Sequence, residues 1–271
     1  MNISIKHSIK AEIFTLLFQH FKAFTDHVNL IFERERLYIQ SMDSSHISIF
    51  EINLPKEWFD IYEFSDNGDE NHSAVTIGIH TGILFKVLNA RDKSQEINFV
   101  YTPETDGDKL YINYTSEVKT EFDKHFEISL LDVDAELMSI PTDEYEAEFS
   151  ISSYNFANII NQLKMFGDNL EVCCNENKIM MSSTNQTEGK MSVEIKIDDL
   201  SSFIIDEGGD IKMSFSLNSL HNICLYNKLS KEVNVSFKNN FPLKVIYTLY
   251  GHENARVIFF LAPKINTNDD D

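Results

Sequence analysis

The sequence has few cysteines and no long apolar runs. Its 271 residues include only three cysteines, two of which, Cys173 and Cys174, are adjacent. Adjacent cysteines rarely bridge one another, so we expect no disulfide framework and a reduced, intracellular protein. No run approaches the roughly 18 apolar residues of a membrane span, and the first residues lack the continuous apolar core of a signal peptide. A membrane-spanning or exported protein is therefore not expected.

Basic residues are also scarce. The chain has 23 lysine and arginine residues against 43 aspartate and glutamate residues, which gives a net charge of −20. The field of such a protein repels phosphate backbones and anionic membranes alike. Any role on nucleic acid must therefore depend on a local basic surface.

Motifs that mark common catalytic sites are missing. The sequence contains no GxxxxGK[ST] loop, no GxSxG turn, no GxGxxG turn after a strand and no HExxH helix. Asp43, Ser45 and His46 could suggest a hydrolytic triad, but neighbours on an extended strand point to opposite faces. The nine histidines are scattered along the chain. We therefore expect no catalytic activity, no metal site and no cofactor.

The sequence does contain a repeated order of helices and strands. Apolar residues at helical spacing predict helices at 8–24, 81–90, 152–168 and 218–229. Thr81 and either Ser152 or Ser153 are the predicted helix caps, and Ile9 and Ile83 are among the side chains expected to face inward. Runs typical of strands lie between these helices. Each half of the chain is therefore predicted to contain a helix, a group of strands, a second helix and a second group of strands, in that order.

The two halves are related by an internal repeat. Leu84 corresponds to Leu220, 136 residues further on, and EINF from Glu96 corresponds at the same offset to EVNV from Glu232. A duplication explains this pattern and predicts two domains of one α+β fold. We place these domains at 1–130 and 146–265, with a connecting loop at 131–145 and an acidic tail at 266–271.

The connecting loop carries apolar residues that a simple spacer would not need. Leu137, Met138 and Ile140 lie in an otherwise acidic segment. They either pack into a core or form part of a docking surface, and the sequence pattern leaves both readings open.

Four segments carry a resemblance to a known family. They are LYIQSMDSSHISIFEINL at 37–54, SLLDVDAELMSIP at 129–141, FGDNLEV at 166–172 and FFLAPKI at 259–265. In this order and spacing they resemble proliferating cell nuclear antigen, the sliding clamp of eukaryotes and archaea. The resemblance implies a DNA-clamp fold with antiparallel sheets outside and two helices of each domain facing a central channel. It also implies a homotrimeric ring around duplex DNA, acting in nuclear replication and repair, or at a cytoplasmic site if the protein is viral.

The resemblance implies functional residues as well. A hydrophobic pocket for a peptide of DNA polymerase or another client maps to Met42, His46, Ile47, Ile49, Met138, Ile140, Pro141, Pro242, Phe260, Ala262, Pro263 and Ile265. DNA would be contacted by Lys22, Lys86, Arg91, Lys164 and Lys228. Subunits would pair along strands near 123–131 and 178–183, with Phe126, Ile128, Ile179 and Met181 at the contact. Lacking a nucleotide-binding loop, such a ring would need a separate ATP-dependent loader.

Two alternatives to a ring stay open. One is a processivity factor of the same fold that holds DNA by charge as a monomer or dimer, which would require a strongly basic DNA face. The net charge of −20 argues against it. The other is a clamp-derived protein that serves only as a scaffold.

Overall fold

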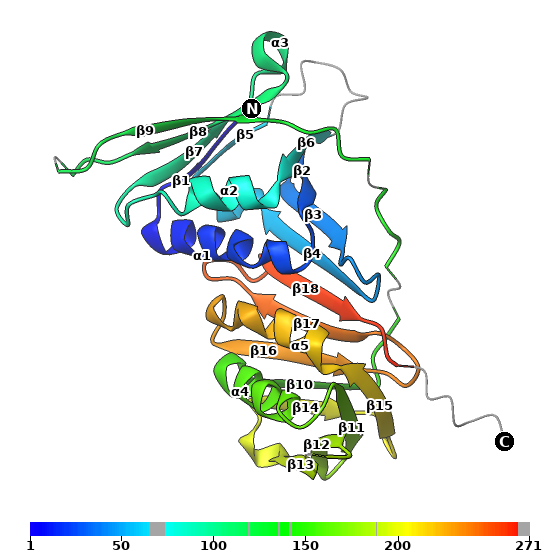
Figure 1. Ribbon diagram of the computed structural model, residues 1–271. Helices are drawn as coiled ribbons and strands as arrows, with labels where there is room; N and C mark the ends of the chain where they lie inside the picture. The colour runs from blue at the N-terminus through cyan, green and yellow to red at the C-terminus, as the bar shows by residue number, and fades with distance from the viewer. Residues whose placement is uncertain (65–73, 119, 135, 141–142, 188, 265–271) are drawn as a thin grey trace. The chain divides into compact units, whose positions relative to one another are not determined.

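The computed structural model (Figure 1) describes residues 1–64, 74–118, 120–134, 136–140, 143–187 and 189–264. Their contacts divide the chain into two compact units. Unit 1 comprises Met1–Ser44, Glu51–Met138 and Thr248–Val257, and unit 2 comprises Ser45–Phe50, Ser139–Tyr247 and the chain from Ile258 onward. Each unit combines antiparallel sheets with a pair of longer helices, which confirms the α+β clamp fold. Among the described residues no helix is long and apolar enough to cross a bilayer.

Unit 1 is built around two helices and a five-stranded sheet. Its elements are β1 (Asn2–Ile5), α1 (Ser8–Gln19), η1 (Phe21–Ala23), β2 (His27–Glu33), β3 (Arg36–Met42), η2 (Lys56–Trp58), β5 (Ile61–Glu63), β6 (Ala74–His80), α2 (Thr81–Leu88), β7 (Glu96–Val100), α3 (Pro103–Asp106), β8 (Lys109–Thr115) and β9 (Lys124–Ser129). The five-stranded sheet has the antiparallel order β5-β1-β7-β8-β9, so β9 is an edge strand. In the other sheet β2 pairs with β3 and β6.

Unit 2 repeats this plan. Its elements are β10 (Ala147–Ser152), α4 (Ser153–Lys164), β11 (Asn169–Asn175), β12 (Lys178–Asn185), β13 (Gly189–Lys196), η3 (Ile197–Asp199), β14 (Ser202–Ile205), β15 (Asp210–Ser216), α5 (Leu217–Cys224), η4 (Leu225–Lys228) and β16 (Glu232–Phe237). Its four-stranded sheet has the order β13-β12-β11-β15, and β10 pairs with β14 and β16. Three further strands, β4 (Ser48–Pro55), β17 (Leu243–Thr248) and β18 (Arg256–Leu261), have residues in both units.

The internal repeat is visible in the structure. Leu84 in α2 and Leu220 in α5 are both fully buried. Strands β7 and β16 begin at Glu96 and Glu232, the two residues that the offset of the repeat pairs. The sequence repeat therefore relates equivalent helices and strands of the two units.

The helix ends differ in part from the sequence-based predictions. Ser152 caps α4, because its hydroxyl accepts the Asn155 N–H at 3.4 Å. The prediction of Thr81 as a cap is wrong: the His80 Nδ1 accepts the Gly82 N–H at 3.1 Å instead. The Thr81 hydroxyl lies inside the unit and donates to the carbonyl of Thr25 at 2.9 Å. An imidazole nitrogen can thus replace the usual hydroxyl at a helix start.

Two apolar helix residues face outward rather than inward. The side chains of Ile9 in α1 and Ile83 in α2 are 46% and 45% exposed. In α1 the buried residues are Ala11, Ile13, Phe14, Leu17 and Phe18. The inward stripe of α1 is therefore rotated away from Ile9, and the prediction that Ile9 and Ile83 face the core is wrong.

Candidate docking site and subunit edges

The segment that leads into the connecting loop is attached to unit 1 at several points. The N–H of Leu131 donates to the carbonyl of Gly78 at 2.8 Å. The Asn29 carboxamide donates to the Val133 carbonyl at 3.0 Å. Loop backbone normally requires such partners wherever it leaves solvent. The segment therefore follows β6 and β2 as far as Val133.

A buried glutamine holds the far end of this segment. The Gln40 side chain, which is 8% exposed, accepts the Met138 N–H at 2.7 Å and donates to the Met138 carbonyl at 3.0 Å. The same amide nitrogen lies 3.1 Å from the Tyr38 hydroxyl, which donates to Glu51. Burial, followed by this bond to Glu51, raises the Tyr38 pKa well above its ordinary value, so the phenol stays a donor. The network fixes Met138, a predicted pocket residue.

Unit 2 brings together a second group of predicted pocket residues. The N–H of Ala262 donates to the Ile47 carbonyl at 2.9 Å, which joins the segment after the SMDSSH motif to the segment after β18. Next along the chain, the Lys264 N–H donates to the Ser214 carbonyl at 2.7 Å. Behind this contact the buried rings of Phe50 and Phe259 lie 6.4 Å apart between centroids.

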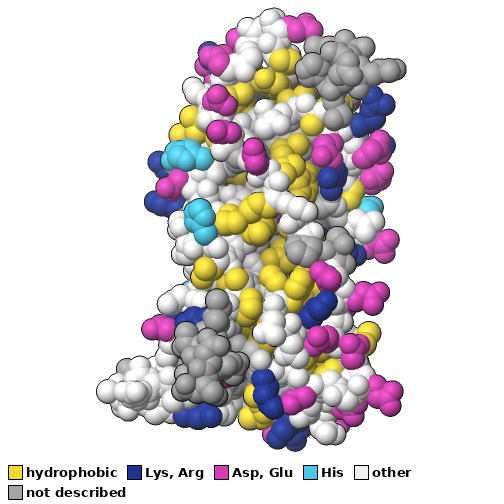
Figure 2. Space-filling model, turned by 90° about the vertical axis from the view of Figure 1, so that its right-hand side faces the viewer, with side chains coloured by type: hydrophobic (Ala, Val, Ile, Leu, Met, Phe, Trp, Pro, Cys, Tyr) yellow, Lys and Arg dark blue, Asp and Glu magenta, His cyan; other side chains and the backbone are white. Residues whose placement is uncertain are grey.

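The side chains of this group are accessible to a partner. Ile47 is 37% exposed, and Ile49 and Phe260 are half-buried. His46 has a φ of 58°, a left-handed turn conformation in which histidine, asparagine and aspartate occur more often than other residues with a Cβ. On the face shown in Figure 2, apolar side chains gather among acidic ones. Such a surface suits a partner with apolar anchors.

The predicted pocket residues are distributed over the two units. Met42 and Met138 belong to unit 1. The members in unit 2 are His46, Ile47, Ile49, Ile140, Pro242, Phe260, Ala262 and Pro263. Pro141 and Ile265 lie outside the described residues. The structure thus brings the Ile47 and Ala262 segments together, while the complete pocket stays a prediction.

The lysines predicted to contact DNA lie on or just after helices. Lys22 in η1, Lys86 in α2 and Lys228 in η4 are exposed, and Lys164 at the end of α4 is half-buried. None of the four has an ion-pair partner among the described residues. They are free to contact phosphate.

Arg91 is placed differently from these lysines. Its Nη1 donates to the carbonyls of Asp92, Lys93 and Gln95 at 3.0, 2.9 and 2.9 Å. Burial lowers the Arg91 pKa below its ordinary value. Because this guanidinium holds together its own turn, we remove Arg91 from the candidate DNA contacts.

Neutral side chains fill much of the remaining helix surface. Asn158, Asn161 and Asn218 are exposed on α4 and α5, as are Tyr154 and Met165 beside them. The Asn161 Oδ1 lies 2.7 Å from a ring nitrogen of His221, and burial together with Lys164 lowers the pKa of that histidine. The helix surface of unit 2 is therefore largely uncharged at neutral pH.

Two family models match almost the whole chain. The model of the proliferating cell nuclear antigen N-terminal domain matches residues 6–137, and that of the C-terminal domain matches 139–265. The chain belongs to the proliferating cell nuclear antigen family. This confirms the resemblance found in the four sequence segments, and it makes the protein a member of a family of non-enzymatic sliding clamps of DNA replication and repair.

Individual relatives are distant but similar along most of their length. Proliferating cell nuclear antigen of Chaetomium thermophilum is 26% identical over 245 residues, which cover 85% of this chain and 86% of the relative. Proliferating cell nuclear antigen 2 of Drosophila melanogaster is 27% identical over 237 residues, 86% of each. Proliferating cell nuclear antigen 2 of Plasmodium falciparum is 22% identical over 266 residues, 95% of this chain and 97% of the relative.

The strand edges of this clamp correct one prediction about subunit contact. Strand β12 is not an edge, because it pairs with β11 on one side and with β13 on the other. Its Ile179 and Met181 are fully buried in unit 2, and Ile128 of β9 is 3% exposed in unit 1. These three side chains cannot be reached by a second subunit, so their assignment to the contact is wrong.

Strand β9 is an edge of the five-stranded sheet, opposite β5, and β13 is an edge of the four-stranded sheet, opposite β15. In β9, Phe126 is half-buried, and its ring lies 5.3 Å from that of Tyr114. In β13, Met191 and Val193 are half-buried, and Ile195 is buried. An edge strand presents unpaired backbone N–H and C=O groups that another chain can use. The edge position of β9 agrees with the sequence-based prediction, whereas β12, the strand predicted for unit 2, lies inside its sheet and its neighbour β13 is at the edge.

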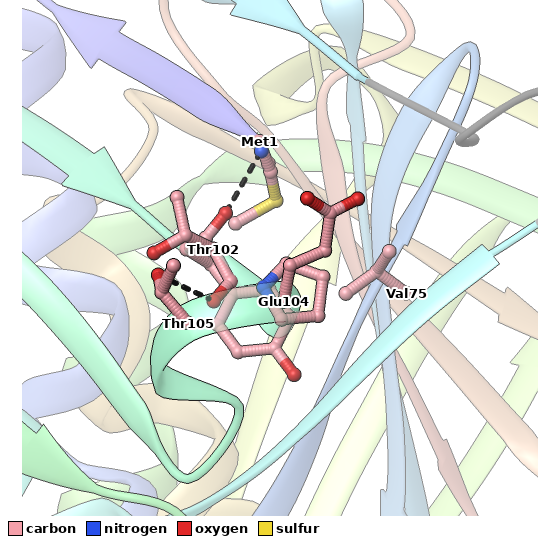
Figure 3. A pocket seen from close by; sticks show the side chains of 7 residues that line it. Met1, Val75, Thr102, Glu104 and Thr105 are labelled. Atoms are coloured by element: carbon pink, nitrogen blue, oxygen red, sulfur yellow. Dashed lines mark hydrogen bonds between the residues drawn. The ribbon is translucent and has the colours of Figure 1, made fainter.

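The clamp also has a small cavity in unit 1, shown in Figure 3. It has a volume of about 210 Å³ and is lined by Met1, Val75 and residues 101–105. The Met1 amine donates to the Tyr101 carbonyl at 2.9 Å. The lining holds one carboxylate, Glu104. Among the described residues no group of three or more His, Cys, Asp or Glu side chains is placed to hold a metal ion.

Proposed function

We propose that three copies of this chain form a closed ring through which duplex DNA passes. The observation that carries the proposal is that β9 in unit 1 and β13 in unit 2, each with apolar side chains along it, both lie at a sheet edge. Two different edges on one chain favour head-to-tail pairing, and such pairing closes into a ring when the rotation is suitable. Three subunits are typical of the family to which the chain belongs.

DNA would be held in this ring mainly by enclosure. Lys22, Lys86, Lys164 and Lys228 are the candidate phosphate contacts, and the amides of Asn158 and Asn218 would add weaker ones. The net charge of −20 disfavours binding by charge alone. A topological link needs no strong affinity, so this helix surface is compatible with sliding.

Client proteins such as DNA polymerase would dock beside the connecting loop. Ile47, Ile49 and Phe260 offer accessible apolar surface, and Met138 is held in place by Gln40. A short helix with an aliphatic and two aromatic anchors would fit such a surface, because a few buried anchors carry most of the affinity of an interface. In this proposal the clamp acts in the nucleus and is opened by a separate ATP-dependent loader.

The decisive experiment is the molar mass in solution, measured by light scattering from low to high micromolar concentration and followed by DNA binding. A mass of three chains supports the ring. A monomer or dimer that binds DNA would replace the ring by a factor that holds DNA by charge. A monomer or dimer that binds no DNA would leave a protein scaffold as the better account.

A further inference from the structure

Phe122, just before the edge strand β9, is the most exposed large apolar side chain of the described residues. It is 82% exposed. It lies two residues before β9, in the segment that connects β8 to β9. Exposing a phenylalanine in this way forfeits the stabilisation of its burial, because aromatic side chains typically bury about 150–250 Å². An exposed apolar side chain of this size on an ordered backbone is a candidate for an interaction site.

The backbone of Phe122 is held from inside unit 1. Its carbonyl accepts a hydrogen bond at 2.8 Å from the side chain of Gln95, which is 1% exposed. The Gln95 Oε1 in turn accepts the Asp92 N–H at 2.9 Å, and the Gln95 carbonyl accepts from Arg91. These hydrogen bonds fix the backbone at Phe122, so little backbone entropy would be lost when a partner covers the phenylalanine side chain.

The alternation of β9 indicates the side of the sheet to which Phe122 belongs. Phe126 and Ile128 pair with the buried Ile112 and Leu110, so the even-numbered residues of β9 face the helix-covered side. Lys124 also points that way, because its Nζ donates to the Ala90 carbonyl after α2 at 2.7 Å. Continuing this alternation by two residues places Phe122 on the same side.

Unit 2 has a groove on the matching side of its β13 edge. The groove lies between α4 and β13 and has a volume of about 650 Å³. Its apolar lining residues are Ile151, Ile159, Val193 and Ile195, and the rest of its lining is polar, including Glu194, Asp199 and Glu232. Ile195 pairs with the buried Ile179, so this row of β13 also faces the helix-covered side.

We propose that Phe122 of one copy inserts into the groove between α4 and β13 of the next copy and anchors the ring contact. This inference rests on the proposed ring. The described strand pairs of both sheets are antiparallel, and an antiparallel pair of β9 with β13 places the start of β9 beside the end of β13. When the helix-covered sides of the two paired sheets face the same way, the Phe122 side chain of one copy lies against Val193 and Ile195 of the next. The occupant of the groove is therefore a second copy of this chain.

The charges at these two strand ends support the pairing. Asp123, the residue just before β9, and Lys196, the last residue of β13, are both exposed. Neither has an ion-pair partner within the described part of the chain. Each occupies the solvent-facing position of its strand by alternation. Opposite charges therefore meet on the outer side of the contact while the apolar rows meet on the inner side.

The test is a dilution series of Phe122→Ala beside the wild-type chain, with molar mass measured by sedimentation equilibrium. We expect the concentration of half-dissociation to rise at least about tenfold, as for a hot-spot anchor. Val118→Ala is the control, because Val118 is 44% exposed in the same segment, and it should leave that concentration unchanged. If the wild type is a trimer and Phe122→Ala dissociates at the same concentration, Phe122 does not anchor the contact, although the proposed ring would stand.

A double-mutant cycle identifies the site that Phe122 enters. Ile159→Ala removes one wall of the groove, and the cycle with Phe122→Ala should be strongly non-additive if the two side chains touch across copies. Additive effects would overturn this groove as the site. A wild-type chain that stays monomeric at every concentration would overturn both the ring and the anchor. Thermal unfolding at a concentration where the wild type and the variants are all single chains checks the fold of each variant, and Phe122→Ala should leave it unchanged because the phenylalanine side chain is exposed in the single chain.

Discussion

The Gln40 carboxamide pairs with both polar backbone atoms of Met138, at 2.7 Å to the N–H and 3.0 Å to the carbonyl. This arrangement is the one a neighbouring strand would make, but a single side chain provides it. It fixes the connecting loop at a residue whose side chain belongs to the proposed client surface. The position of the loop thus depends on Gln40 as well as on the loop sequence.

Gln40→Leu should weaken the binding of client peptides. Leucine fills a similar volume but leaves both Met138 groups without this partner, and each lost buried bond destabilises the local structure by about 1–3 kcal/mol. We expect the dissociation constant of a clamp-binding peptide, measured by titration calorimetry, to rise about tenfold. Gln162→Leu, at an exposed position of α4, is the control. An unchanged constant for Gln40→Leu would show that the loop is ordered without this bond.

Gly78→Ala should detach the start of the connecting loop. A Cβ at Gly78 would lie 2.1 Å from the Leu131 carbonyl oxygen and 2.9 Å from a Val133 methyl carbon, so the backbone must move. We expect the free energy of unfolding, from urea titration, to fall by about 1–3 kcal/mol. Thr76→Ala, an exposed position on the same strand, should change it by less than about 0.5 kcal/mol. Equal stabilities of the two variants would contradict this account.

Ile49→Ala combined with Ile140→Ala should abolish client-peptide binding and leave the ring intact. Both side chains are half-buried members of unit 2, and neither lies in β9 or β13. The control is Ile204→Ala in β14, where the isoleucine is 68% exposed. Peptide affinity and molar mass are measured on the same samples. Retained affinity in the double variant would refute the pocket assignment.

Phe126→Glu should dissociate the ring. The substitution places a carboxylate in an apolar contact, where its desolvation is unfavourable. Light scattering should report single chains at concentrations where the wild type is a trimer. Ile83→Glu introduces the same charge on an exposed helix position of unit 1 and should leave the trimer intact. If the Phe126→Glu variant is still a trimer, the assignment of β9 to the subunit contact is wrong.

Asn161→Lys with Asn218→Lys should make DNA binding more dependent on salt. Each added phosphate contact steepens the slope of log K against log salt concentration by about 0.9 on duplex DNA. Binding of the trimer to a linear duplex, measured by fluorescence anisotropy at several salt concentrations, gives this slope. Thr76→Lys, on an exposed strand position, controls for charge alone. Equal slopes for the asparagine variants and the wild type would place DNA away from α4 and α5.

The sequence by itself determined the family, the two-fold repeat and most of the strands. Alternation is enough for a strand such as β4, whose residues from Ser48 to Pro55 are buried and half-buried in turn. The offset between Leu84 and Leu220 likewise needs no structure, because duplicated elements keep their spacing. The site segments were recognised by residue order, which is local information.

Only the tertiary structure decided which strand is an edge and which helix residues face outward. The runs at β12 and β13 both look like strands, and alternation tells which side chains face inward but not whether a backbone has neighbours on both sides. In the same way, Ile9 and Ile83 fit a helical stripe, but the rotation of a helix is set by the surface it packs on. Edges, helix rotation and the Gln40–Met138 pairing depend on contacts between distant residues, which the local pattern does not contain.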